Sequence, residues 1–368
     1  MCTMSRAAFL NLKGRGAGSE PRNRFEKWHI DWDAGMLEEM ARSDPDHVRP
    51  LPRTQIIRDD TRSLITSNRS PDIGFDASLN PYRGCEHGCA YCYARPYHEY
   101  LGFNAGLDFE TRIMVKPEAP ALLEAELASR SWRPQVLACS GVTDAYQPVE
   151  RHLKITRRCL EVLERCRHPV VIITKNALVI RDLDLLSSLA SHQAAAVAVS
   201  VTTLDAGLAG LLEPRASRPE ARLRAISELA AAGVPVGVSI APIIPGLNDH
   251  EIPAIAEAAA AAGAKFAFST LVRLPYGVKD IFSDWLDLHR PGEAKKILDR
   301  IRAARAGKLN ESGFGSRMRG TGAVAEGIQQ LFRVSTQRAG LSRADFQFCL
   351  STAAFRRPSG EQLEFEFL

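Results

Sequence analysis

Three cysteines stand close together in the stretch NPYRGCEHGCAYCYARPYHEY. Cys85, Cys89 and Cys92 are separated by three and then two residues, and neither a regular helix nor a strand aims side chains at that spacing toward one point. A loop can do so, and Gly84 and Gly88 give this segment the backbone freedom to wrap. Thiolate is a soft ligand that selects zinc, copper or an iron–sulfur cluster. The spacing therefore predicts a metal centre.

Two kinds of metal centre fit the three cysteines. A structural zinc site takes four protein ligands, and His87 or His98 is available as the fourth, although no second cysteine pair follows at zinc-finger spacing. A four-iron cluster has four corners, so three cysteines leave one iron open to a substrate or cofactor. From the donor residues alone, both interpretations stay open.

Short apolar runs alternate with helical patterns from about residue 76 onward. Runs that are apolar on both faces are typical of strands in a buried parallel sheet. Five of them cover 135–140, 170–175, 195–201, 235–241 and 265–270, and the segment before Cys85 supplies a first strand. Helical patterns between them cover 148–166, 180–190, 219–232 and 250–262. Repeated βα units imply right-handed crossovers and a parallel sheet. We predict an incomplete parallel (β/α)6 barrel, with the cysteines at the carboxyl end of its first strand; a doubly wound open sheet is the alternative.

Composition excludes several classes of protein. The 368 residues carry 47 Lys and Arg against 43 Asp and Glu, a net charge of +4, which is too small to argue for nucleic-acid binding from the whole chain. No apolar run approaches ~18 residues, so we expect no membrane span. Most of the eight cysteines are scattered, unlike those of a disulfide scaffold, and no secretory signal is evident. We expect a cytoplasmic monomer with free thiols.

The character of the sequence changes twice along the chain. We expect three parts: an irregular N-terminal arm at 1–75, the barrel at 76–290, and a C-terminal extension over the barrel mouth at 291–368. Residues 302–343 hold eight Lys or Arg against two acids. This excess could mark a nucleic-acid face, with Phe314 and Phe332 stacking on bases, but we favour a solvated pair of basic helices that caps the barrel.

The cysteine spacing, the aromatic residue at Tyr91 and the βα pattern that follows together resemble the radical S-adenosylmethionine superfamily. The wider strings NPYRGCEHGCAYCYAR, SGVTDAYQPVE, EPR and PIIPGLND are similar to its spore photoproduct lyase-like branch of uncharacterised bacterial proteins. The resemblance covers residues 76–290. It implies that Cys85, Cys89 and Cys92 hold a [4Fe–4S] cluster, whose open iron chelates the amino and carboxylate groups of S-adenosylmethionine.

The same resemblance implies a chemistry and its partners. One electron, from a flavodoxin-type or ferredoxin-type donor, cleaves a C–S bond of S-adenosylmethionine and yields a 5′-deoxyadenosyl radical, which abstracts hydrogen from a substrate. The substrate could be DNA damaged at a pyrimidine pair, a small molecule or a protein side chain. The competing interpretation is a binding protein without catalysis, whose cysteines hold zinc.

Cofactor contacts are implied at the ends of the first two strands. Tyr91 would pack near the adenine, unless it is an ordinary loop aromatic. After the second strand the family usually shows Gly-Gly-Glu, which holds the methionine amino group, whereas this chain has Ser140-Gly141-Val142-Thr143-Asp144. The backbone at Gly141 and the side chains of Thr143 and Asp144 offer acceptors instead. The alternative is that Thr143 or Asp144 caps the next helix.

Further contacts are implied at the third and fourth strands. Lys175 closes the third strand and could pair with the methionine carboxylate, although a lysine at a strand end is often solvated. Ser200 and Thr202 end the fourth strand, where hydroxyl groups suit the ribose diol. The alternative is that Thr202 serves only the strand's β propensity.

In EPRASRPEARL, three arginines compete as clamps for a carboxylate, which a planar guanidinium suits. They are Arg215, which we select, and Arg218 and Arg222; the alternative for each is a surface or structural ion pair. Beyond the fifth strand, Ile243 and Ile244 could contact adenine or belong to the core.

The remaining cysteines carry weaker expectations. Cys139 ends the second strand and could return a hydrogen atom to the substrate, as a cysteine does in the photoproduct lyases, although a buried free thiol is the default. Cys159 and Cys166 share one helix face, so we expect packing roles. Cys2 and Cys349 are isolated.

Overall fold

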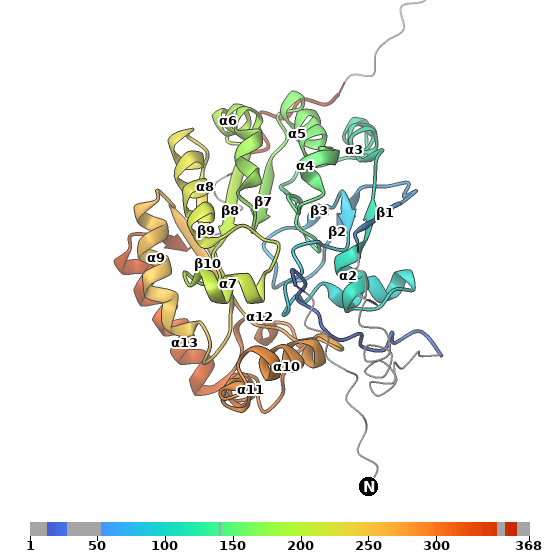
Figure 1. The fold of residues 1–368 in the computed structure, drawn as a ribbon. Coiled ribbons are helices and arrows are strands. Elements are labelled where there is room, and N and C mark those ends of the chain that lie inside the picture. Colours follow the sequence, from blue (N-terminus) through green and yellow to red (C-terminus); the bar gives the residue numbers. More distant parts are fainter. Residues whose placement is uncertain (1–12, 28–52, 140, 344–349, 359–368) are drawn as a thin grey trace, which may run out of the picture.

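The fold is a curved sheet wrapped by helices (Figure 1). The computed structural model describes residues 13–27, 53–139, 141–343 and 350–358. Eight strands lie in the order β11-β10-β9-β8-β7-β6-β3-β2. All neighbouring pairs are parallel except β2 with β3. The strands are β2 (Ile65–Ser67), β3 (Ala77–Leu79), β6 (Leu137–Cys139), β7 (Val170–Thr174), β8 (Ala195–Ser200), β9 (Val236–Ile243), β10 (Phe266–Leu271) and β11 (Ser342–Arg343).

The order of the strands decides between the two predicted folds. From β3 through β10 each strand of this sheet lies beside the one before it in the chain, whereas a doubly wound sheet reverses direction at a switch point. In the described part of the chain β2 and β11 do not pair, so the barrel stays open. The predicted incomplete parallel (β/α)6 barrel is therefore confirmed.

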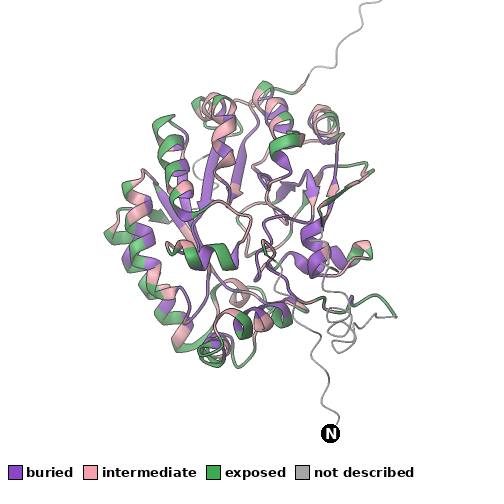
Figure 2. Ribbon diagram, viewed as in Figure 1, coloured by how far each residue is buried: buried purple, intermediate pink, exposed green. Residues whose placement is uncertain are grey.

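Helices cover the outside of the sheet (Figure 1). They are α4 (Glu150–Leu153), α5 (Ile155–Arg165), α6 (Leu183–Ser191), α8 (Pro219–Ala231) and α9 (Ile252–Ala261). Each lies within a predicted helical range or within one residue of it. The strands of this sheet from β3 to β9 are largely buried, whereas the helices bury only their inner faces (Figure 2). Because strands between two layers face no water, they read as continuous apolar runs, as in AAVAVS of β8.

A smaller sheet lies beside the barrel where the cysteine segment leaves it. Its order is β1-β5-β4, with β1 (Gln55–Arg58), β4 (Tyr82–Arg83) and β5 (Arg112–Val115). Around it run the 3-10 helix η1 (Arg95–Leu101) and the helices α2 (Leu107–Thr111) and α3 (Ala119–Ala128). Part of the expected N-terminal arm thus supplies strands: β1 to this sheet and β2 to the barrel sheet. The predicted part boundaries themselves stay a prediction.

The C-terminal region closes one side of the barrel (Figure 1). It contains α10 (Val278–His289), α11 (Ala294–Ala303), α12 (Ser316–Arg319) and α13 (Gly322–Arg338). α13 packs against α9, and Phe332 on α13 is buried in the main core. Stacking of Phe332 on bases is therefore wrong, because the core already covers its ring. Phe314 is 64% exposed.

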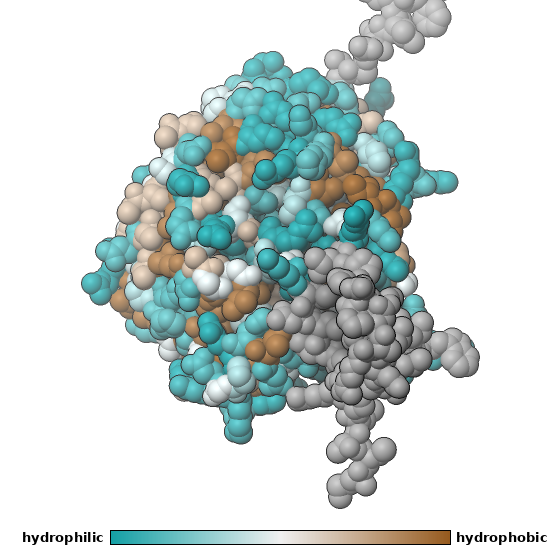
Figure 3. All heavy atoms as spheres, in the orientation of Figure 1, coloured by the Kyte–Doolittle hydropathy of each residue, from teal (hydrophilic) through white to brown (hydrophobic). Residues whose placement is uncertain are grey.

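The surface and the helices bear on whether the chain has a membrane span. The face in Figure 3 is largely hydrophilic, with hydrophobic residues in separate patches. Among the described residues, no helix is long and apolar enough to cross a bilayer.

His168, just before β7, makes stability depend on pH. Its ring is fully buried, and burial lowers the pKa of His168 to about 4. Its Nε2 accepts a hydrogen bond from the indole of Trp132 at 3.2 Å. In the unfolded chain the pKa is about 6.5. Below that value the unfolded chain binds a proton that the folded chain does not, so stability falls as the pH falls.

We therefore expect His168 to cost about 2 kcal/mol of unfolding free energy between about pH 7 and pH 5. Urea unfolding of the wild-type protein and of His168→Gln at the two pH values measures this loss. His98, whose pKa is also lowered to about 4, contributes equally to both proteins and cancels in the comparison. Equal pH dependence in the two proteins would contradict the prediction.

Candidate active site

The three predicted ligand cysteines lie on a loop that leaves β4 and enters η1. We call residues 84–92 the cysteine loop. Cys85 and Cys89 are buried, Cys92 is half-buried, and all three are free thiols. Gly88 adopts a left-handed backbone with φ of +66°, and a Cβ there would lie 2.7 Å from a carboxylate oxygen of Glu110. The sequence expectation of a glycine-dependent loop is confirmed.

A buried arginine fixes the path of the cysteine loop. Arg95 donates to the carbonyl oxygen of Cys89 through Nε at 3.0 Å and Nη2 at 2.9 Å. Its Nη1 donates to the carbonyls of Ala105 and Gly106. Nη2 also pairs with the carboxylate of Glu110, and both side chains are fully buried. Five donor contacts of Arg95 thus tie the loop to α2 and to the segment before it.

Residues 13–27, the N-terminal strap, cover the cysteine loop. The backbone amides of Gly16 and Ala17 donate to the Glu110 carboxylate at 3.2 and 2.8 Å. Gly16 lies so close to the loop that a Cβ there would sit 1.6 Å from the carbonyl oxygen of Gly88. Ala17 is buried. Residues 13–27 show no periodic pattern, so this contact was not predicted.

The thiols of the cysteine loop form a donor set that suits an iron–sulfur group. Burial raises the pKa of Cys85, Cys89 and Cys92, and the Cys92 thiol raises the pKa of Cys85 and Cys89 further. Thiolates in such a place need the positive charge of a metal centre. Among the described residues, no three His, Cys, Asp or Glu side chains converge on one point where a single ion could sit. In a four-iron cluster each thiolate binds its own iron.

Both histidines that could complete a zinc site have other partners. His87 is buried, with Nδ1 3.4 Å from Asp144 and Nε2 3.3 Å from the amide of Asn176. Nε2 of His98 lies 3.0 Å from the carbonyl of Arg112.

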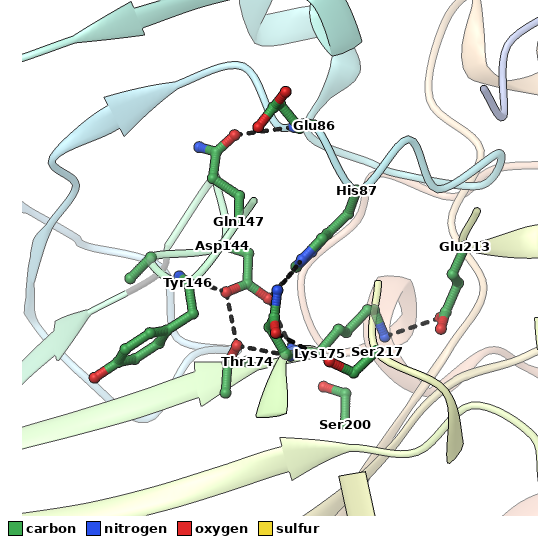
Figure 4. A network of polar contacts seen from close by, with 12 residues as sticks. Glu86, His87, Asp144, Tyr146, Gln147, Thr174, Lys175, Ser200, Glu213 and Ser217 are labelled. Carbon is green, nitrogen blue, oxygen red and sulfur yellow. Dashed lines mark hydrogen bonds and ion pairs between the residues drawn. The ribbon is translucent and has the colours of Figure 1, made fainter. Parts of the chain in front are cut away.

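Asp144 links the loop to the ends of two strands (Figure 4). Its Oδ1 accepts from the hydroxyl of Thr174 at 2.7 Å and from the amide of Tyr146 at 2.9 Å. Its Oδ2 accepts from the amide of Lys175 at 2.7 Å and faces His87. The carboxylate therefore holds the β6 and β7 ends beside the cysteine loop. A contact with the cofactor amino group stays a prediction, as it does for Thr143, whose hydroxyl donates to the carbonyl of Tyr82.

Glu213 is a second centre of the polar network, and sequence reasoning missed it. Its carboxylate accepts from Thr202 at 2.6 Å and from the hydroxyl of Tyr91, and it pairs with Lys175 at 3.3 Å and with Arg222. Burial alone raises the pKa of Glu213, but the two cations and two hydrogen bonds bring the pKa well below its ordinary value. Glu213 opens the EPR string, but its partners come from distant segments of the chain, so the string alone does not indicate this role.

The network brings several predicted cofactor contacts together at one edge of the barrel. Lys175 Nζ donates to the hydroxyl of Thr202 at 3.2 Å and to the carbonyl of Ala241 at 3.0 Å. Tyr91 is buried and packs in a hydrophobic cluster that includes Ile244. The centre of its ring lies 5.8 Å from Nζ of Lys175. Ser200 ends β8 in the same view (Figure 4). Their roles toward the cofactor stay predictions.

The three candidate arginines have different surroundings. Arg222 is buried, pairs with Glu213, and donates to the carbonyls of Ser200 and Ser217, which fits the structural alternative. Arg215 pairs with Glu86 at 3.0 Å. Arg218 is the residue before α8.

Other predicted residues lie in or near the core. Cys139 is buried on β6. Burial raises the pKa of its thiol, and Cys159, Glu150 and Asp144 raise that pKa further. A buried free thiol of this kind is ordinary in a protein core. Cys159 and Cys166 are buried in the core as predicted, as is Ile243. Gly141 donates to the side chain of Asn80. Ser140, Cys2 and Cys349 lie outside the described residues.

Comparison with known proteins decides the family. Residues 79–259 match the model of the Radical SAM superfamily. The chain therefore carries a domain of the radical SAM superfamily at residues 79–259. Its members use a [4Fe–4S] cluster and S-adenosylmethionine, and the cysteine loop falls inside the matched residues. The predicted family and its cofactors are thus confirmed.

Relatives of this radical SAM chain include uncharacterised proteins. One from Mycobacterium tuberculosis is 36% identical over 221 residues, which cover 60% of this chain and 65% of that protein. Another, from Methanocaldococcus jannaschii, is 29% identical over 199 residues, covering 54% of this chain and 71% of that protein. The chain thus spans less than two thirds of the length of the mycobacterial relative.

Solved structures show the radical SAM fold in more detail. A variant of spore photoproduct lyase superposes with a TM-score of 0.57 at 17% identity, covering 84% of this chain and 93% of that one. The lyase complexed with dinucleoside spore photoproduct superposes with the same TM-score and coverage at 15% identity. At these identities the likeness shows the fold.

Proposed function

We propose that this chain is a radical SAM enzyme that cleaves S-adenosylmethionine reductively and uses the 5′-deoxyadenosyl radical to abstract hydrogen from a substrate. The observation that carries the proposal is the cysteine loop, in which three clustered free thiols lie at the carboxyl edge of a parallel barrel. Chemistry in such barrels is performed at this edge. A cluster held by Cys85, Cys89 and Cys92 would supply one electron, received from a flavodoxin-type or ferredoxin-type donor, and would bind S-adenosylmethionine.

The chain's own residues would bind, orient and shield the cluster and S-adenosylmethionine. Cys85, Cys89 and Cys92 would hold the cluster, while Arg95 and the N-terminal strap fix the loop and cover it. S-adenosylmethionine would lie beside three kinds of polar group. They are the ammonium of Lys175, the hydroxyls of Ser200 and Thr202, and the carboxylate of Asp144. We place the enzyme in the cytoplasm as a monomer.

The proposal allows several classes of substrate. A nucleic acid is one candidate, supported by the fold shared with spore photoproduct lyase, whose solved complexes contain a dinucleoside photoproduct. The exposed ring of Phe314 beside Arg317 adds a surface on which a base could stack.

Replacing Cys89 by Ala is expected to abolish cluster binding and cofactor cleavage. Anaerobically reconstituted wild-type protein should contain about four iron and about four sulfide per chain and release 5′-deoxyadenosine when reduced with dithionite. A loop with only two ligands cannot hold the cluster. The Cys89→Ala protein should therefore contain little iron and release no 5′-deoxyadenosine. Iron analysis and chromatography of the nucleoside measure both.

Cys166→Ala is the matched control, because it makes the same chemical change at a core thiol. It should keep its iron and its activity. Undiminished cleavage by Cys89→Ala would reject the assignment. Wild-type protein that binds one zinc per chain and no iron would favour the zinc-binding alternative, because zinc is colourless and redox-inactive.

A further inference from the structure

Arg273 is a half-buried cation that lacks an anionic partner. It follows the end of β10, and its Nε is buried with no hydrogen-bond partner. Its Nη1 donates to the sulfur of Met318 at 3.6 Å, and sulfur is only a weak acceptor. Within the described ranges, no carboxylate lies within ion-pairing distance of Arg273. A buried donor without an acceptor destabilises the protein, so this guanidinium lacks a group that would satisfy it.

Arg273 faces the cysteine loop across the barrel mouth. Its guanidinium lies 5.3 Å from the centre of the Tyr93 ring, and Tyr93 directly follows the ligand Cys92. The Tyr93 hydroxyl donates to the carbonyl of Gly141 at 3.0 Å, just beyond β6. The contact therefore spans from the β10 side of the sheet to the β6 side, over the strand ends where the cofactor would lie. Tyr93 is 43% exposed, so a molecule at the mouth can reach this pair.

The neighbouring arginines are already satisfied. Arg305 is fully buried and donates to three backbone carbonyls, those of Leu271, Val272 and Arg317. Arg317 pairs with Asp72 at 2.6 Å. Burial lowers the pKa of Arg273, and the nearby Arg317 lowers it further, while Asp72 acts in the opposite sense. Of these three guanidinium groups, Arg273 is the one to which the structure gives neither a carboxylate nor a carbonyl acceptor, and the neighbouring cations add positive charge that attracts anions.

We propose that Arg273 binds an oxyanion of the substrate at the barrel mouth, with the Tyr93 ring as the floor of the site. The inference rests on the proposed function, because it places the substrate beside the cofactor. A planar guanidinium binds phosphate and carboxylate equally well in geometry, so the shared chemistry is an oxyanion attached to a flat or apolar body. The substrate class is thus an anionic molecule, and Arg273 determines its specificity.

The test uses reconstituted holoprotein that is kept oxidised, with S-adenosylmethionine present. Three probes share one aromatic ring: phenyl phosphate, benzoate and the neutral benzyl alcohol. Calorimetric titration should show binding of at least one anion, and Arg273→Met should weaken that binding roughly tenfold or more, since a charge-assisted contact is lost. Arg273→Lys should restore part of it. Arg302→Met is the control, because Arg302 is half-buried on α11 and already pairs with Asp299.

Each result has one meaning. Preference for phenyl phosphate identifies a phosphate-bearing substrate, and preference for benzoate identifies a carboxylate. Equal affinity of wild-type and Arg273→Met protein, or binding of benzyl alcohol as tight as that of both anions, overturns the proposal. The comparison among probes needs only wild-type protein, so it decides even if Arg273→Met does not fold. If wild-type protein releases 5′-deoxyadenosine but binds neither anion, the inference alone fails; if it neither holds a cluster nor cleaves the cofactor, the proposed function fails.

Discussion

Replacing Glu213 by Gln is expected to lower the free energy of unfolding by about 3–5 kcal/mol, because removing one member of a buried ion group leaves the others uncompensated. Arg222, which is buried, would keep only carbonyl partners, and Lys175 would lose its anion. The shape of the side chain hardly changes, so the loss reports on charge. Anaerobic urea unfolding of the two proteins measures it.

Asp184→Asn is the control for this experiment. Asp184 pairs with Arg157, but its side chain is 60% exposed, so its loss should cost less than about 1 kcal/mol. The double variant Glu213→Gln with Arg222→Met should recover part of the stability, since it removes both charges of the closest pair. A loss below about 1 kcal/mol in Glu213→Gln would contradict the network as described.

Replacing Gly16 by Ala is expected to detach the N-terminal strap from the cysteine loop. The added Cβ would collide with the carbonyl of Gly88, which is backbone and cannot yield without moving the loop. Detachment breaks the two amide bonds to the buried Glu110 carboxylate. Because bonds to charged groups are worth about 1.5–3 kcal/mol each, the strap amides should exchange with solvent roughly a hundredfold faster.

Hydrogen exchange followed by mass spectrometry measures the strap directly, and loss of visible absorbance in air measures the shielding of the cluster. Both rates should rise in Gly16→Ala. Gly327→Ala serves as the control, because a Cβ on that exposed face of α13 would meet nothing within 4 Å. If the strap amides of the Gly16→Ala protein exchanged as slowly as those of the wild-type protein, the loop would tolerate the added Cβ and the prediction would be wrong.

The part of the fold that could be predicted is the part with a local signal. Buried strands such as β8 are continuous apolar runs, and α8 begins at a proline and is followed by a glycine. β1 and β2, by contrast, have four and three residues with mostly exposed side chains, which leaves too little pattern to distinguish them from loop.

For the candidate site, topology was the useful guide. The family resemblance implied cofactor contacts at Asp144, Lys175 and Thr202, and the structure brings the three together because the carboxyl ends of parallel strands meet at one edge. The importance of Glu213 depends on partners from the cysteine loop, two strands and a helix. The role of Gly16 depends on its distance from Gly88. Neither relation is written in the local sequence, because both arise from packing between segments far apart in the chain.

The hold of Arg95 on the cysteine loop has a consequence for maturation of the protein. Its donors are bound to backbone carbonyls and to Glu110, all of them groups of the polypeptide. Because these contacts need no iron, we expect the loop to acquire its shape when the chain folds, and the conformational entropy of ordering it to be lost at that step. The cluster should then bind to a loop that is already ordered. The rate of cluster binding should be limited by the delivery of iron and not by rearrangement of the chain.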